Sequence, residues 1–144
     1  MKIATPRVLT AAEKGYIAGI LDGEGHLGIV RRKRTWKRDP GRPYYLRAIV
    51  QVAQVDRRLL DYLADLVGGG TLILNHGHAC YNLVFYPATL RWLLPEIIPH
   101  LVLKRRQAHL LLDFMARSKW GGKELTTEEF LARFVANANA LKAR

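Results

Sequence analysis

Three glycines spaced four residues apart constrain this chain more than any other feature of its sequence. Gly15, Gly19 and Gly23 lie in the stretch GYIAGILDGEG, and residues four apart share one face of a helix. Glycine inside a helix costs about 1 kcal/mol relative to alanine, so three in register predict a face of nearly bare backbone that another element approaches closely. We expect a second copy of the same helix there, with Ala18 on the same face.

Two carboxylates, Asp22 and Glu24, follow at the expected C-terminus of this helix. The helix macrodipole disfavours negative charge there by roughly 0.3–1 kcal/mol. Two such ends beside each other across a twofold axis would repel unless a divalent cation, which prefers oxygen ligands, lay nearby. We interpret Glu24 as a metal ligand and Asp22 as a structural group that satisfies backbone groups near the paired helix ends. The alternative is a glycine-rich packing helix without catalysis.

Length and charge limit the classes of protein to consider. The 144 residues predict one domain, residues 1–144, and a formal net charge of +11 with a pI near 10.2 indicates a polyanionic partner, either nucleic acid or an anionic membrane face. No transmembrane run or signal peptide is recognisable, so we expect a soluble intracellular protein without a membrane partner. The lone Cys80 fits a reducing compartment.

The hydrophobic pattern predicts an α+β fold in the order αββαββα. Thr10 and Glu13 have capping-box spacing and begin a motif helix over about residues 10–24. Alternation predicts strands at 26–34, 44–54, 71–75 and 80–86, and helical spacing predicts helices from Asp56, from Pro87, where Pro95 should shorten or kink the helix, and over about 104–144. We expect a four-stranded antiparallel sheet with helices on one face, and an open second face that binds DNA.

The basic charge is concentrated in one segment, residues 31–47, where eight lysines and arginines accompany one acid. A two-stranded ribbon fits the roughly 12 Å major groove, so the hairpin is predicted to follow double-stranded DNA, although a charge run is often only a solvated surface. Arginines suit guanine and amides suit adenine, while loop cations hold phosphates. The predicted DNA-binding residues are His26, Gly28, Val30, Arg32, Arg34, Lys37, Arg38, Arg47, Ile49, Gln51, Ile73, Asn75, His76, Cys80 and Asn82.

The HGHAC stretch offers an alternative metal site. His76, His78 and Cys80 supply three candidate zinc ligands, where a structural zinc site normally takes four. The spacing therefore favours a loop that faces DNA over a zinc site.

Residues 17–25, IAGILDGEG, resemble the LAGLIDADG motif of the homing endonucleases, with Gly23-Glu24 in place of Ala-Asp. Two further stretches, QVAQVDRR and LKRRQAHL, resemble the single-motif, homodimeric branch of that family, so the similarity extends over about residues 10–112. The resemblance implies that Glu24 binds Mg²⁺ with help from the Gly23 carbonyl, with Mn²⁺ or Ca²⁺ substituting for binding. It further implies that Gln54 positions a water and that Lys104 and Arg58 stabilise charge on phosphate.

Each of these residues also has a structural interpretation. Gln54 would then only end its strand, Lys104 would be a helix-surface lysine, and Arg58 would bind phosphate or water without a catalytic role. The leading hypothesis is a homodimeric endonuclease, with Gly15, Ala18, Gly19 and Asp22 at its interface, that cuts both strands of a long, nearly palindromic DNA site by metal-dependent hydrolysis. The alternatives are an RNA maturase that assists intron splicing and a non-catalytic DNA-binding regulator.

Overall fold

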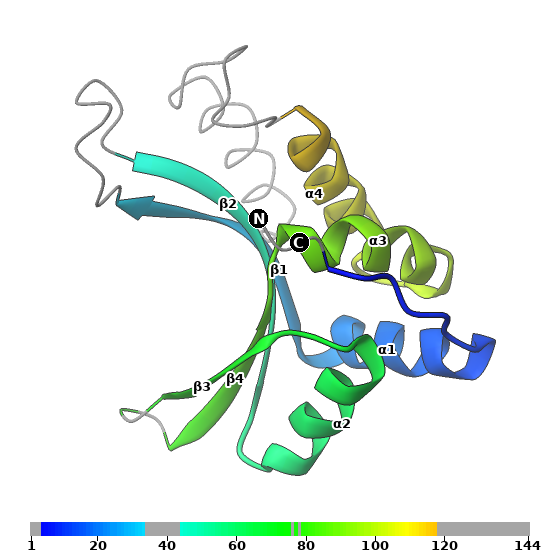
Figure 1. Ribbon diagram of the computed structural model, residues 1–144, viewed down its shortest axis with the longest axis vertical. Coiled ribbons are helices and arrows are strands. Elements are labelled where there is room, and N and C mark those ends of the chain that lie inside the picture. The colour runs from blue at the N-terminus through cyan, green and yellow to red at the C-terminus, as the bar shows by residue number, and fades with distance from the viewer. Residues whose placement is uncertain (1–3, 34–43, 76, 78, 118–144) are drawn as a thin grey trace.

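The computed structural model describes residues 4–33, 44–75, 77 and 79–117. The elements alternate as the sequence predicted, and the expected α+β order is confirmed (Figure 1). In chain order they are α1 (Ala11–Glu24), β1 (Gly25–Lys33), β2 (Tyr44–Gln54), α2 (Arg57–Val67), β3 (Thr71–Asn75), β4 (Cys80–Phe85), α3 (Pro87–Ile97), a short 3-10 helix η1 (Ile98–His100) and α4 (Arg105–Arg117). The part of the predicted C-terminal helices beyond residue 117 lies outside the described residues.

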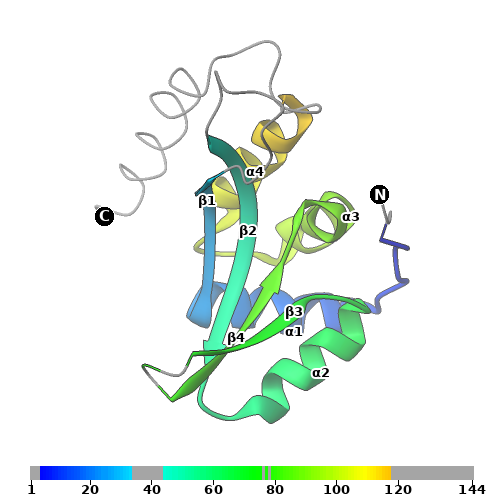
Figure 2. The same cartoon turned by 60° about the vertical axis from the view of Figure 1, so that its left-hand side comes forward.

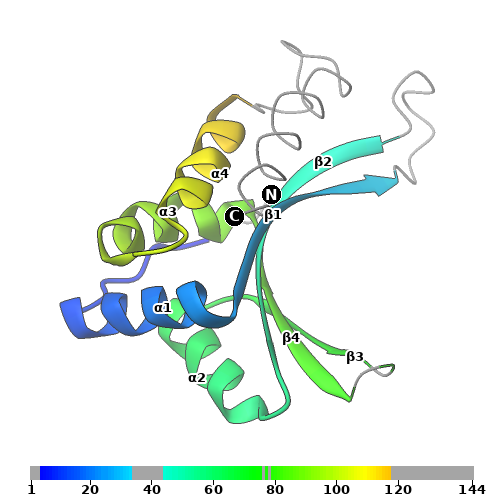
Figure 3. The same cartoon turned by 180° about the vertical axis from the view of Figure 1, so that it is seen from behind.

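The four strands form one antiparallel sheet in the order β1-β2-β4-β3. The long β1–β2 hairpin extends past the shorter β3–β4 hairpin, as Figure 2 shows. All four α-helices lie on one side of the sheet, and at both ends the strands curve away from them, so the face opposite the helices is concave (Figures 1 and 3). We call this face the uncovered face, within the part of the chain that the structure describes.

Local sequence signals set the beginning of α1. The Thr10 hydroxyl accepts the Glu13 N–H at 3.1 Å, and the Glu13 carboxylate accepts the Thr10 N–H at 2.9 Å. These two bonds form the capping box that the sequence predicted.

Alternating apolar residues of the strands form the core with the helices. Ala48, Val50 and Val52 of β2 are fully buried against the helical layer, because successive strand side chains point to opposite faces. Each fully buried large apolar side chain contributes about 1.5–3 kcal/mol. The main helical contributors are Leu60, Leu63, Leu90, Leu93, Leu94, Ile97, Leu111 and Phe114.

Two predicted features differ from the structure. Alternation along the strand at 71–75 predicts that Leu74 points inward with Leu72, but Leu74 is 43% exposed, because β3 is an edge strand and its hairpin extends beyond α2 (Figure 1). Pro95 does not shorten α3, which continues to Ile97 before η1. The carbonyl left without a partner by Pro95 belongs to exposed Arg91, where water can take the place of the missing N–H.

Over the described ranges, the helices are too short or too polar to cross a membrane.

Candidate active site and nucleic-acid interface

The candidate active site lies where α1 ends and β1 begins. Glu24 is the last residue of α1 and is exposed. The last carbonyls of a helix have no intrahelical partner, so the Gly23 carbonyl lies at a terminus that attracts cations. Within the described residues, no hydrogen bond or ion pair engages the Glu24 carboxylate. This end of α1 therefore offers free oxygen ligands to solvent.

Asp22 fixes the segment that precedes α4. Its carboxylate accepts backbone N–H groups from Val102 at 2.8 Å, Leu103 at 3.1 Å and Lys104 at 3.0 Å. Three donors converge on one anion, and hydrogen bonds to charged groups are roughly twice as strong as neutral ones. The expected structural role of Asp22 is therefore observed, but the backbone groups that it satisfies here belong to the same chain.

The Lys104 side chain provides a second link between the segment before α4 and the end of α1. Its ammonium donates to the Leu21 carbonyl at 2.8 Å and to the Gly25 carbonyl, which places positive charge at the helix C-terminus where the macrodipole favours it. Partial burial lowers the pKa of Lys104, and the carboxylates of Asp22 and Glu24 oppose that shift. The ammonium thus lies beside the candidate metal ligand, with one of its three N–H groups still available.

Gln54 ends β2 at the same end of the sheet as Glu24. Gly25 pairs with Val52, and Gln54 lies two residues beyond Val52, opposite Tyr81 of β4. The register therefore brings Gln54 to the sheet end where α1 terminates. Its role in positioning water stays a prediction.

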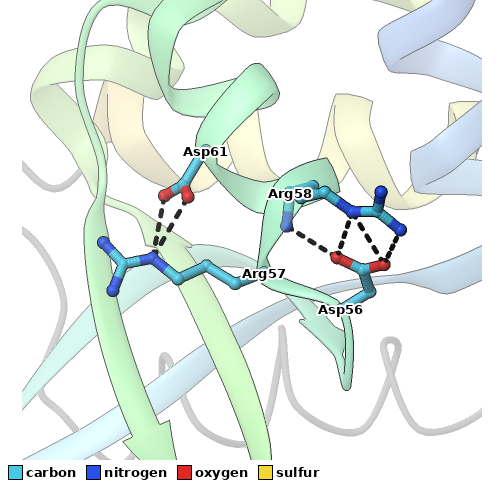
Figure 4. A network of polar contacts seen from close by, with 4 residues as sticks. All are labelled: Asp56, Arg57, Arg58 and Asp61. Atoms are coloured by element: carbon cyan, nitrogen blue, oxygen red, sulfur yellow. Dashed lines mark hydrogen bonds and ion pairs between the residues drawn. The ribbon is translucent and has the colours of Figure 1, made fainter.

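Arg58 occupies the start of α2, where it pairs with Asp56 (Figure 4). Asp56 caps this helix by accepting the Arg58 backbone N–H at 3.0 Å, and it also contacts the guanidinium at 2.6 Å. Side-chain hydrogen bonds from Arg58 and then its backbone N–H lower the pKa of Asp56 to about 2, and Asp56 raises the pKa of Arg58. Because the Arg58 side chain is 91% exposed, it remains accessible for the predicted contact with phosphate. Arg57 pairs separately with Asp61 at 3.1 Å.

The glycine face of α1 is bare in the part of the chain that the structure describes. A Cβ added at Gly15, Gly19 or Gly23 would meet no atom within 4 Å, and all three glycines are exposed. The prediction that Ala18 shares this face is wrong, because Ala18 is 0% exposed and belongs to the core. It precedes Gly19 by one residue, and consecutive residues lie about 100° apart around a helix, so its methyl group turns toward the interior.

The predicted DNA-facing side chains occupy the uncovered face by strand alternation. His26, Gly28, Val30 and Arg32 of β1 pair with Gln51, Ile49, Arg47 and Tyr45 of β2. Farther across the sheet, Asn82 of β4 pairs with Ala53 of β2 on one side and with Ile73 of β3 on the other. Cys80 of β4 pairs with Asn75 of β3.

Exposure on this face is uneven. Arg32 and His26 are exposed, whereas Gly28 and Ile49 are buried and Asn82 is only 9% exposed. A Cβ at Gly28 would lie 2.8 Å from the His26 Nε2, so a larger residue there would require the exposed His26 ring to shift. Outward-pointing side chains in the middle of a concave sheet therefore shield one another.

Several polar contacts organise the same face. Gln51 Nε2 donates to Asn82 Oδ1 at 2.9 Å, which joins two of the amides predicted to bind DNA. The Arg47 guanidinium lies 3.9 Å from the centroid of the Tyr86 ring, a cation–π contact. Asn75 Oδ1 accepts the Gly77 N–H at 3.2 Å.

Some predicted residues lie outside the described part of the chain. These are Arg34, Lys37, Arg38 and His76, together with His78 of the possible zinc stretch. Among the described residues, no group of three or more histidine, cysteine, aspartate or glutamate side chains is placed to hold a metal ion.

Sequence reasoning missed the link between Asp22 and α4, although a signal was present. The residues before α4, Val102, Leu103 and Lys104, include none of the side chains that usually cap a helix N-terminus. A helix start without a local cap requires an acceptor from elsewhere in the fold, and Asp22 supplies it.

Comparison with known proteins gives matches in structure only. No protein-family model matches the sequence, and no curated protein matches it significantly. The archaeal intron-encoded homing endonuclease I-Vdi141I, solved in complex with DNA, is 21% identical, with a TM-score of 0.70 over 92% of this chain and 83% of that chain. The homing endonuclease I-CvuI, solved with a DNA target, is 23% identical, with a TM-score of 0.65 over 74% and 67% of the two chains.

A third structure carries the name of the motif. I-SmaMI, a LAGLIDADG homing endonuclease bound to cleaved DNA, is 15% identical with a TM-score of 0.65, and the match covers 96% of this chain but 47% of I-SmaMI. Identities this low establish the architecture, and the IAGILDGEG stretch occupies the end of α1, as the sequence predicted. The chain therefore has the LAGLIDADG homing endonuclease fold.

Proposed function

We propose that this protein is a site-specific endonuclease that cuts both strands of a long, nearly palindromic DNA duplex by metal-dependent phosphodiester hydrolysis. The observation that carries the proposal is the position of Glu24. Its free carboxylate lies at the end of α1, next to the Lys104 ammonium and at one end of a sheet whose uncovered face presents arginine and amide side chains.

Charge and shape support double-stranded DNA as the substrate. The net charge of +11 favours a polyanion, and the β1–β2 hairpin is a two-stranded ribbon, an element that the major groove admits. I-Vdi141I and I-CvuI, which share this fold, were solved as complexes with DNA.

The residues at the end of α1 fit a hard divalent cation such as Mg²⁺, because the Glu24 carboxylate and the Gly23 carbonyl supply oxygen ligands. Mn²⁺ or Ca²⁺ would replace Mg²⁺ for binding. When bound, the metal would supply charge neutralisation and a water of lowered pKa. The Gln54 amide would orient that water, and the remaining Lys104 N–H and the exposed Arg58 guanidinium would stabilise negative charge on the phosphate.

Two copies of the chain would complete the enzyme. Each chain contributes a single carboxylate, that of Glu24, to the proposed site. The glycine face of α1 in each chain has room for the α1 of a second chain. Val102 and Leu103, which Asp22 holds beside α1, are strongly exposed and would gain burial in such a pair. This chain also spans about half of I-SmaMI, so two copies would be needed to match that chain in size.

Cleavage of a randomised duplex DNA library with Mg²⁺ or with EDTA tests the proposal. We expect Mg²⁺-dependent cuts at one long, nearly palindromic sequence, read by sequencing the new ends. Sequence-selective binding without cutting would overturn the endonuclease and indicate a DNA-binding regulator. Failure to select any DNA, together with binding to a structured RNA, would indicate a maturase.

A further inference from the structure

A hydrogen bond joins two strands in the middle of the uncovered face. Gln51 of β2 donates through Nε2 to Oδ1 of Asn82 on β4 at 2.9 Å. The direct partner of Gln51 on β4 is Val84, two residues along from Asn82, so Gln51 and Asn82 are diagonal neighbours on one face of the sheet. Diagonal positions are within reach of long side chains.

The two amides differ in their access to a ligand. Asn82 is 9% exposed, whereas Gln51 is half-buried. A buried polar group that loses its partner costs about 1–3 kcal/mol, so the bond to Asn82 restrains the orientation of the Gln51 amide. Asn82 lies too deep to read a base itself.

The oriented Gln51 amide matches one base. Nε2 carries two N–H groups, so donation of one to Asn82 leaves the other N–H and Oε1 for a ligand. Adenine presents an acceptor at N7 and a donor at N6 in the major groove, whereas guanine presents two acceptors there. The remaining N–H and Oε1 therefore complement adenine, and Oε1 would oppose the O6 of guanine.

We propose that Gln51 reads an adenine in each half of the target site, and that Asn82 is a positioning residue that sets this preference without touching DNA. This inference rests on the proposed function, because it requires duplex DNA on the uncovered face.

The register also predicts where this adenine lies. Arg47 precedes Gln51 by four residues on the same face of β2, which corresponds to about 13 Å at roughly 3.3 Å per residue. That distance spans about four base steps of roughly 3.4 Å. Because the Gln54 end of β2 lies at the Glu24 end of the sheet, the Gln51 position falls closer to the cleavage point than the Arg47 position.

Equilibrium selection from randomised DNA duplexes, with the full chain in Ca²⁺, tests the inference. The parent should prefer adenine at one position of each half-site. Gln51→Ala should reduce that preference about 5- to 100-fold. Asn82→Leu keeps the buried volume but removes the acceptor for Gln51, so it should reduce the preference by a similar factor. Asn82→Asp keeps an acceptor oxygen for Gln51 and should retain the preference, with weaker overall affinity because it adds negative charge.

Two further variants sharpen the test. Gln51→Glu should change the preferred base at that position from adenine to cytosine, since a carboxylate accepts from cytosine N4. Gln107→Ala is the matched control, because this half-buried amide belongs to α4, on the helical side of the sheet, and should leave the base preference unchanged. Arg47→Ala should change the preference about four base pairs farther from the centre of the site.

The outcomes separate this inference from the proposed function. An unchanged preference for adenine in Gln51→Ala, or in a folded Asn82→Leu, overturns the inference while sequence-specific binding by the parent still supports the function. If Asn82→Leu does not fold, as judged by its thermal transition, an unchanged base preference in Gln51→Glu overturns the reading of adenine. A parent that binds no duplex overturns both.

Discussion

The carboxylate of Asp22 accepts the backbone N–H of Lys104 at 3.0 Å, while the Lys104 ammonium donates back to the carbonyls that flank Asp22 and Glu24. The end of α1 and the segment before α4 are thus linked twice. The Asp22 carboxylate accepts backbone N–H groups of the segment before α4, and the Lys104 ammonium donates to backbone carbonyls at the end of α1. This reciprocal arrangement satisfies the end of α1 and the segment before α4 together. It also holds the ammonium beside Glu24.

Replacing Asp22 with asparagine should lower the free energy of unfolding by about 1–3 kcal/mol, since the charge that holds three N–H groups is lost. Chemical denaturation of the full chain measures the effect. Asp113→Asn is the control, because Asp113 makes an exposed pair with Arg117 four residues along α4, worth about 0.3–0.5 kcal/mol. Equal losses in the two variants would contradict the role assigned to Asp22.

Replacing Glu24 with glutamine should abolish cleavage and leave affinity for duplex DNA largely intact. The amide keeps the size of the side chain but lacks the negative charge that a hard cation requires. Glu96→Gln is the control, because Glu96 pairs at 2.6 Å with Lys14, about 15 Å along α1 from Glu24. Full cleavage by the Glu24 variant in Mg²⁺ would remove this carboxylate from the mechanism.

Replacing Gly19 with leucine should stabilise the single chain and weaken its association with a second chain. No atom lies within 4 Å of an added Cβ, and leucine is a better helix former than glycine, so we expect the single chain to gain about 0.5–1 kcal/mol. The same side chain should block close contact between two α1 helices, and sedimentation should shift from dimer to monomer. Ala116→Leu, at an exposed position of α4, should leave the parent's association unchanged. A Gly19 variant that still sediments as a dimer would exclude the glycine face from the interface.

The Asp56 carboxyl should titrate near pH 2 in the folded chain, below its ordinary value of 3.8, because Arg58 donates hydrogen bonds to it. A folded-state pKa below the unfolded value means that the contribution of Asp56 to stability is present above about pH 4 and is lost as pH falls toward 2. Carboxyl NMR titration measures this pKa. Arg58→Ala should return it toward 3.8, whereas Arg57→Ala should not, since Arg57 pairs with Asp61. A pKa of Asp56 that does not respond to Arg58→Ala would contradict the pairing.

Affinity for duplex DNA should fall steeply with salt, because each phosphate neutralised by lysine or arginine releases counterions and adds about −0.9 to the slope of log K against log[salt]. Fluorescence anisotropy at several salt concentrations gives the slope. Arg32→Ala, which removes an exposed cation of β1, should reduce the slope by about 1 if it contacts phosphate and leave it unchanged if it reads a base. A flat response in the parent would argue against the basic hairpin as a DNA-binding element.

The sequence predicted most of the fold because its signals are local. The capping box at Thr10 and Glu13, the N-cap at Asp56 and the strict alternation of β2 each need only neighbouring residues. These signals set the order of the elements and the face of the sheet that each strand residue occupies. Gln54 was placed at the end of its strand by the same reasoning.

The remainder depends on tertiary contacts that have no local signal. Ala18 is small enough for either side of α1, and only the packing of the helix on the sheet decides that it is buried. Asn82 points outward as predicted, but the curvature of the sheet buries it and brings Gln51 to its amide. The bonds from Asp22 to residues 102–104 join segments that no periodicity relates.

Those last bonds have a consequence for how the protein is made. Asp22 and its N–H donors lie 80 to 82 positions apart, so the ribosome must reach residues 102–104 before Asp22 can make these bonds. A translation product that stops before residue 102 has Glu24 but neither Lys104 nor the backbone donors that surround Asp22. Under the proposed function, such a fragment therefore lacks a cation that the site uses on phosphate, and we expect it not to cleave DNA.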